Sequence, residues 1–173
     1  MNWENLTGNM DSQHSPLLLV AYGFSNFVGL LILWAAFRRP GVARLALVLL
    51  FGWAAWTNYH TCHKNPEMYL GYSRYAVWYG AFIRGWFGRH ITPMVSTIAV
   101  AQGLIALGLL YRGIWVKAAC TGVIIFLLAI APLGFGAAFP FPLIVAFAAW
   151  KIMPKAGAPL WSGQAYQLLT RKK

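Results

Sequence analysis

Acidic residues are nearly absent from this chain, which has only Glu4, Asp11 and Glu67 among its 173 residues. None of the three lies in an apolar stretch, whereas proton relays and membrane isomerases place ionisable groups among their helices. General acid–base catalysis within a membrane also needs a titratable side chain at the reacting group. The scarcity of acids therefore argues against an intramembrane acid–base enzyme.

Cysteine and recognisable catalytic motifs are also scarce. Cys62 and Cys120 are too few for a disulfide framework, and the chain has no CxxC or CxxCH motif. We expect the two cysteines near opposite membrane faces, too far apart to form a disulfide. A nucleophile elbow, a phosphate loop, a Rossmann glycine fingerprint and an HExxH motif are all missing. The sequence therefore supports none of the enzyme classes that these motifs mark.

Charged residues make up 10% of the chain, against roughly 25% in soluble domains. Hydrophobic residues make up 60% and aromatic residues 16%. The net charge of +11 would suggest a nucleic-acid partner in a soluble protein, but here the basic residues lie between apolar stretches, as membrane insertion requires. The composition predicts a polytopic membrane protein with one domain and no nucleic-acid partner.

The apolar stretches predict an all-α bundle of five transmembrane helices, because each approaches the roughly 20 residues that one bilayer crossing needs. The predicted spans are residues 16–37, 43–59, 94–111, 114–132 and 138–153. Residues 1–15, which are polar and lack the basic start of a cleavable signal peptide, form an outer segment. Residues 154–173 form a basic interfacial tail on anionic lipid at the cytoplasmic face. We expect Arg44 to snorkel from the start of the second span, and Pro140 and Pro142 to lie in or just before the first turn of the fifth.

The basic residues predict the orientation. With the N-terminus outside, ten of the 14 lie inside: Arg38, Arg39, Arg44, Arg112, Lys117, Lys151, Lys155, Arg171, Lys172 and Lys173. The other four lie outside: Lys64, Arg74, Arg84 and Arg89. The positive-inside rule therefore predicts an N-terminus outside and a C-terminus in the cytoplasm. The expected location is the bacterial inner membrane.

The long connection Tyr59–Pro93 contains a candidate metal site. His60 and His63 share a face if the second helix continues for one more turn, with Cys62 beside them, and His90 could supply a third imidazole. Imidazole and thiolate together suit copper, zinc or haem iron. The alternative is that these histidines bond water or lipid headgroups at the membrane surface.

The same connection contains a second candidate, an aromatic segment with basic residues. Its rings recur at three- and four-residue steps, at Tyr72, Tyr75, Tyr79, Phe82 and Trp86. This spacing predicts a helix on the outer leaflet, whose Arg74, Arg84 and Arg89 face headgroups or an anionic partner. The alternative is an aromatic lid, with Tyr75, Tyr79 and Trp86 in contact with a flat hydrophobic ligand such as a quinone.

Three neutral polar residues, Asn26, Thr97 and Gln102, lie within the predicted spans. A polar side chain at membrane depth generally bonds a neighbouring helix in preference to facing lipid. Asn26 and Gln102 are therefore candidates for helix contacts, with ligand contacts as the alternative.

From Gly41 onward the chain resembles the DoxX/DoxD-like family of small membrane proteins. The resemblance rests on ARLALVLLFGWAAW, on the aromatic connection that follows it, and on the helical pair MVSTIAVAQGLIALGLLYRGIWVKAACTGVIIFLLAIAP with its short basic turn. It implies a four-helix bundle, here with one additional N-terminal span. Members of the family typically carry a glutamate where this chain has Gln102 in AQGL, so a proton-coupled role of that acid is not carried over.

The family implies an accessory subunit beside respiratory or sulfur-oxidising enzymes that pass electrons to quinone. We therefore predict an inner-membrane accessory subunit, not catalytic on its own, which docks a protein partner or shelters a quinone or lipid at the outer face. One alternative is a protein that handles copper or haem through His60, Cys62 and His63. The other is a structural lipid-binding module.

Overall fold

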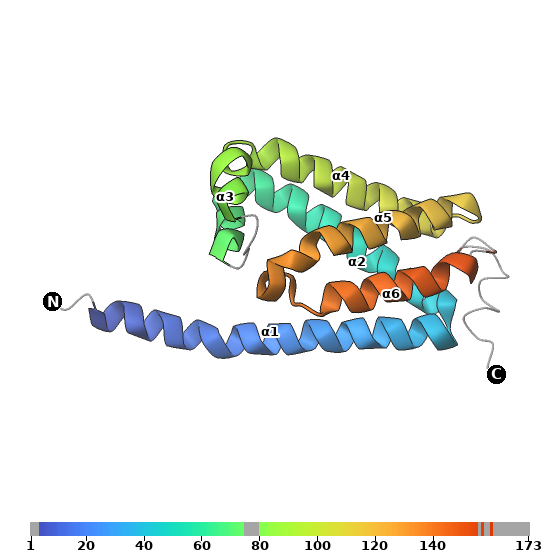
Figure 1. Cartoon of the computed structure of the whole chain (residues 1–173), viewed down its shortest axis with the longest axis horizontal. Coiled ribbons are helices and arrows are strands. Elements are labelled where there is room, and N and C mark those ends of the chain that lie inside the picture. Colours follow the sequence, from blue (N-terminus) through green and yellow to red (C-terminus); the bar gives the residue numbers. More distant parts are fainter. Residues whose placement is uncertain (1–3, 75–79, 156, 158–159, 161–173) are drawn as a thin grey trace.

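The computed structural model describes residues 4–74, 80–155, 157 and 160. The regular secondary structure of these residues is helical, and they include no strand. The long helices are α1 (Glu4–Arg38), α2 (Pro40–Lys64), α4 (Ile91–Leu110), α5 (Ile114–Ile130) and α6 (Phe141–Ile152), and they form one elongated bundle (Figure 1). The prediction of an all-α helical bundle is confirmed for the described part of the chain.

Four candidate membrane spans are found among the described residues, by helix length and composition: Leu18–Arg38, Pro40–Lys64, Ile91–Leu110 and Ile114–Ala137. Large apolar side chains on these helices, such as Leu49, Leu104 and Ile125, are more than half exposed, which suits a lipid-facing surface. The fifth predicted span is not confirmed. Its helix, α6, has 12 residues, about 18 Å of helix against a hydrocarbon core of roughly 30 Å.

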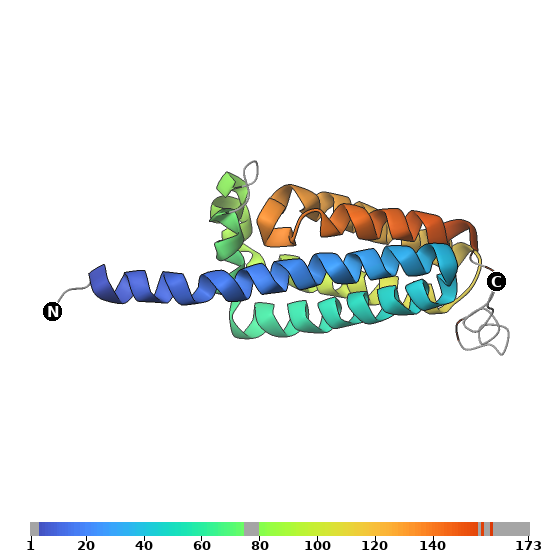
Figure 2. The same ribbon diagram turned by 90° about the horizontal axis from the view of Figure 1, so that it is seen from below.

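Two helices extend further than their apolar stretches predict. Helix α1 begins at Glu4, so residues 4–15 continue the helix of the first span, and α1 projects beyond the bundle (Figures 1 and 2). Helix α2 begins with Pro40 in its first turn and continues to Lys64, past the predicted end at Tyr59. A proline suits a first helical turn because its missing N–H has no partner there in any case.

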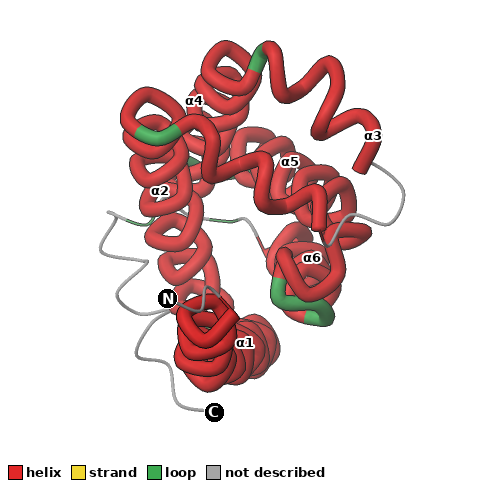
Figure 3. The backbone as a smooth tube through the Cα atoms, turned by 90° about the vertical axis from the view of Figure 1, so that its left-hand side faces the viewer, coloured by secondary structure: helices red, strands yellow, loops and turns green. Residues whose placement is uncertain are grey.

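The connection between α2 and α4 forms a cap over one end of the bundle. The cap comprises the 3₁₀ helix η1 (Pro66–Arg74), the short helix α3 (Gly80–Phe82) and the π-helical turn η2 (Ile83–Phe87), while residues 75–79 lie outside the described part. A view onto this end shows α3 beside α5, and the part of the cap that follows α2 crossing in front of α5 (Figure 3). The described parts are thus two short helical pieces, where the aromatic spacing predicts one helix.

Helices α2 and α4 pack side by side and antiparallel. Thr92 Oγ1 donates to the carbonyl of Cys62 at 3.0 Å near the cap. At the opposite end, which we call the turn end, the Arg44 guanidinium donates to the carbonyls of Leu109 and Tyr111. Arg44 is only 4% exposed, so the prediction that it snorkels to the surface is wrong. Its side chain instead binds two backbone carbonyls at and just after the C-terminal end of α4, where helix carbonyls accept from partners outside the helix.

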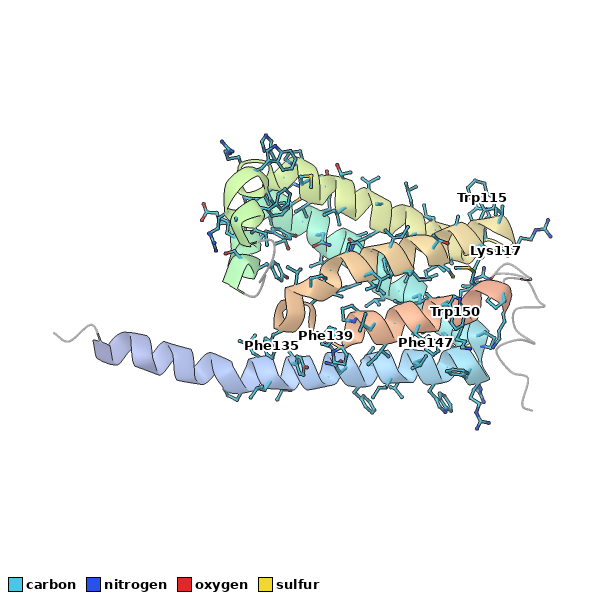
Figure 4. All side chains as sticks on the ribbon, viewed as in Figure 1. Trp115, Lys117, Phe135, Phe139, Phe147 and Trp150 are labelled. Carbon is cyan, nitrogen blue, oxygen red and sulfur yellow. The ribbon has the colours of Figure 1, made fainter. Side chains whose placement is uncertain are left out.

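Helices α1 and α6 form the other main pair of the bundle, and α5 lies between α4 and α6. At the turn end, Lys151 Nζ of α6 lies 4.6 Å from the ring centroid of Trp150 and 5.5 Å from that of Phe37 on α1. Phe147 and Trp150 follow one another along α6 in Figure 4. Pro140 caps α6 and Pro142 lies in its first turn, as predicted.

The main hydrophobic core occupies the turn-end half of the bundle. Its buried side chains include many small ones, namely Ala35, Ala36, Ala43, Ala119, Ala148 and Ala149. Small residues let helices approach closely where lipid supplies no hydrophobic drive for their association. Cys62 and Cys120 are both free thiols, as expected, and belong to separate clusters of buried residues.

Candidate ligand cavity

A cavity of about 600 Å³ lies beneath the cap, where α2, α4, α5 and α6 meet. Its walls are mainly apolar and include Phe51 of α2, Val95 of α4, Phe126 of α5 and Phe141 of α6. The cap contributes aromatic rings to the lining, at Tyr69, Tyr72, Phe82 and Phe87. The volume lies within the range of small-molecule sites, which combine apolar walls with a few polar groups.

Three of the polar side chains that line the cavity form one hydrogen-bonded chain, which we call the polar chain. Tyr69 of the cap donates its hydroxyl proton to Asn58 Oδ1 at 3.0 Å, and Asn58 Nδ2 donates to Gln102 Oε1 at 2.9 Å. All three residues line the cavity. Gln102 is 2% exposed, which makes it one of two buried polar or charged residues in the described part of the chain. The chain thus runs from the cap through α2 to α4.

The antiparallel pairing of α2 and α4 brings these groups together. One turn of α2 beyond Asn58 lies Cys62, whose sulfur is 3.5 Å from Ser96 Oγ on α4. Cys62, Ile91 and Val95 form a small buried cluster against which Tyr69 of the cap packs. This cluster holds the cap against both helices, and so places the Tyr69 hydroxyl beside Asn58.

Burial raises the pKa of Tyr69 to about 12. The phenol is therefore protonated at neutral pH and acts as a donor. Two acceptors for its proton belong to Asn58, the side-chain Oδ1 and, at 3.3 Å, the backbone carbonyl, and the Thr61 side chain also hydrogen-bonds the phenol. Within the described residues, Gln102 Nε2 has no hydrogen-bond partner.

The predicted ligand-contact residues differ in whether they line the cavity. Gln102 lines the cavity, whereas Trp86 does not and instead stacks on Phe82 and His90. Tyr75 and Tyr79 lie outside the described residues. Of the predicted ligand contacts in the described part, only Gln102 therefore belongs to the cavity wall.

Asn26 is not among the described residues that line the cavity. Its Nδ2 donates to the carbonyl of Ala138 at 3.1 Å, in the turn before α6. One turn earlier on α1, Tyr22 donates to the carbonyl of Phe139 and stacks on Phe135 at 4.9 Å. Figure 4 shows Phe135 and Phe139 beside α1. Asn26 is thus a contact between α1 and that turn, the first of the two predicted roles.

Three predicted metal ligands share one local arrangement. The Nδ1 atoms of His60, His63 and His90 lie 3.3, 2.7 and 2.9 Å from the carbonyls of residues 56, 59 and 86, four positions earlier in each case. Each imidazole also lies against the aromatic ring of that same earlier residue, with ring centroids 4.5–4.6 Å apart. The Nδ1 atoms are therefore engaged with carbonyls nearby in the chain.

The thiol of the predicted metal cluster is buried. Cys62 is 0% exposed, and its sulfur lies 3.3 Å from both His63 Nδ1 and the Tyr59 carbonyl. His60 and His63 do lie on the last turns of α2, as the continued helix requires. Among the described residues, no group of three or more His, Cys, Asp or Glu side chains could hold a metal ion.

The basic residues of the cap are exposed where their side chains are described. Arg84 and Arg89 both face outward from the bundle, and the side chain of Arg74 lies outside the described part. These positions leave Arg84 and Arg89 accessible to headgroups or to a partner.

Sequence reasoning missed two of the three members of the polar chain. Asn58 lies in the mixed TNYH stretch at the end of an apolar run, and Tyr69 lies in a connection rich in aromatic residues. A signal for Asn58 was present, because the helix of the second span continues through it and makes it an internal polar residue.

Comparison with protein-family models, with curated proteins and with solved structures gives no match.

Proposed function

We propose that this protein is an accessory subunit of the bacterial inner membrane that holds a flat lipophilic molecule of the quinone class in the cavity beneath the cap. The observation that carries the proposal is Gln102, which is 2% exposed and lines an apolar cavity, and whose Nε2 has no hydrogen-bond partner in the described chain. A ligand oxygen in the cavity would accept from this donor, and a hydrogen bond of this kind contributes about 0.5–1.5 kcal/mol.

The shape and chemistry of the cavity support a ring with few polar groups. Aromatic rings line it from the cap, from α2 and from α5, and flat ligands stack on such surfaces. A quinone ring carries carbonyl oxygens that accept hydrogen bonds, and its apolar tail is compatible with a lipid-exposed bundle. The resemblance to DoxX/DoxD-like proteins agrees with this ligand class.

The absence of acids limits what the protein would do with the ligand. Gln102 stands where the family carries a glutamate, and an amide neither takes up nor releases a proton near neutral pH. The described lining contains no carboxylate or histidine. The proposed role is therefore to bind and position the ligand for a redox partner, without proton-coupled conversion by this chain.

The proposed topology is five passes with the N-terminus outside, counting α6 as a short fifth crossing. The cap and the cavity then face the periplasm, and the turn end, with Arg112 and Lys117, faces the cytoplasm. Figure 4 shows Trp115 and Lys117 at the turn end, the expected place for an aromatic and a basic residue at a membrane surface. Arg84 and Arg89 on the outer face would contact headgroups or the partner protein.

The experiment is to measure the binding of a short-chain quinone to the full chain in lipid nanodiscs. We expect Gln102→Leu, which removes the amide at similar volume, to weaken binding roughly tenfold. The matched control is Thr97→Val on the same helix, because Thr97 is exposed and bonds only the carbonyl of Pro93 in its own helix. Wild-type protein that binds no quinone would overturn the proposal.

A further inference from the structure

We infer that the polar chain gives the cavity a fixed hydrogen-bond direction, so that it selects an aprotic carbonyl oxygen over the corresponding hydroxyl. This inference rests on the proposed function, since it concerns which ligands the same cavity holds. For a quinone-class ligand it means that the oxidised form binds more tightly than the quinol.

The direction begins at Tyr69. Its hydroxyl has one proton, and the two Asn58 atoms within hydrogen-bond distance, Oδ1 at 3.0 Å and the backbone carbonyl at 3.3 Å, are both acceptors, while the Thr61 side chain, which also hydrogen-bonds Tyr69, can donate its own proton to the phenol oxygen. The backbone carbonyl cannot donate, and it helps to keep the phenol in the donor role. The Asn58 side chain therefore presents its oxygen to the cap and its NH₂ group to α4.

The direction continues into Gln102. Because Asn58 Nδ2 points at Gln102 at 2.9 Å, the glutamine must present Oε1 to it. The reverse orientation would place two NH₂ groups against each other, with no acceptor between them. Gln102 consequently turns Nε2 toward the rest of the cavity, and the polar chain ends in a hydrogen-bond donor.

Gln102 Nε2, the last donor of the polar chain, distinguishes a ligand carbonyl oxygen from a ligand hydroxyl. A carbonyl oxygen accepts from Nε2 and leaves no polar hydrogen unpaired. A hydroxyl at the same place brings its own proton into a mainly apolar cavity, where Asn58 Oδ1 and Gln102 Oε1 each already accept one hydrogen bond and are directed at their partners in the polar chain. Leaving that proton unpaired carries a desolvation penalty, so the hydroxyl form binds less well.

The test compares matched ligand pairs with the full chain in nanodiscs. One pair is a short-chain benzoquinone and its quinol under anaerobic conditions, and the other is a redox-inert aryl ketone and its alcohol. We expect the wild type to bind the carbonyl member roughly tenfold more tightly in both pairs. In Tyr69→Phe the phenol is lost and Asn58 is free to rotate, so the ratio should fall below about twofold while carbonyl binding persists.

The control is Tyr59→Phe, because it removes a phenol hydroxyl from an exposed residue of α2 that does not line the cavity. It should leave the ratio unchanged. Equal binding of both members by the wild type, or tighter binding of the hydroxyl member, overturns the direction but leaves the cavity as a ligand site. No binding of any of the four probes overturns the proposed function itself. The wild-type ratio decides the matter even if Tyr69→Phe fails to fold.

Discussion

Arg44 provides a sharp test of how this bundle is held together. It is a cation buried at the turn end, and the carbonyls of Leu109 and Tyr111 that accept its hydrogen bonds belong to the end of α4. A positive charge at a helix C-terminus is favoured by the helix dipole and by the unpaired carbonyls there. The informative substitution is Arg44→Met, which keeps much of the side-chain length and removes the donors.

The expected loss of stability follows from two opposing terms. Each carbonyl left without its partner costs about 1–3 kcal/mol, while removal of the buried cation recovers part of its desolvation cost. We expect a net loss of about 3 kcal/mol, equivalent to a fall in melting temperature on the order of 10 °C for a chain of this size. The melting temperature of Arg44→Lys should lie between those of the wild type and Arg44→Met, because an ammonium keeps the charge but cannot reproduce the forked geometry of a guanidinium.

The assay is thermal unfolding in detergent, followed by fluorescence-detected size exclusion. The matched control is Lys117→Met, which removes one positive charge from the same end of the bundle at an exposed position. It should change stability by less than about 0.5 kcal/mol. If Arg44→Met melts with the wild type, the buried guanidinium is not needed to hold α4 against α2, and our account of the turn end is wrong.

Two further predictions concern packing and topology. A Cβ added at Gly29 would lie 2.9 Å from Cδ2 of Phe141, whereas one added at Gly23 meets nothing within 4 Å. Gly29→Ala should therefore lower the stability by about 2 kcal/mol, and the control Gly23→Ala should not lower it. Equal melting temperatures of the two variants would contradict this contact between α1 and α6. A reporter fused to the C-terminus should be active only in the cytoplasm, and activity in the periplasm would reverse the proposed orientation.

The ends of the helices were predictable only where the end of an apolar run coincides with a residue that stops a helix, such as proline or glycine. Helix α2 passes Tyr59 because the residues that follow are polar but contain no proline or glycine before Pro66. Asn65, which precedes that proline, is disfavoured in the helical conformation and ends α2. The boundary of the apolar run marks the edge of the lipid, and this is not the same property as the end of the helix.

The candidate site was predictable in part, for a related reason. Gln102 was identified because an amide inside an apolar run is conspicuous whatever the fold. The importance of Asn58 and Tyr69 depends on the pairing of α2 with α4 and on the return of the cap over the bundle, which local pattern does not encode. The prediction for Arg44 was wrong for the same reason, because the carbonyls that accept its hydrogen bonds lie 65 and 67 residues away in the sequence.

The uneven packing of the two ends indicates how a ligand would enter. At the turn end, alanines from α1, α2, α5 and α6 are buried in one core, so these four helices pack closely there. At the cap end, the α2 and α5 walls carry large rings such as Phe51 and Phe126, and the space between the helices remains hollow beneath the short helical pieces of the cap. Opening the cavity from the turn end would require separating the core, whereas opening it from the cap end requires moving only those pieces and the small cluster around Cys62. A ligand that dissolves in the membrane would therefore enter beside the cap and reach Gln102 from that side.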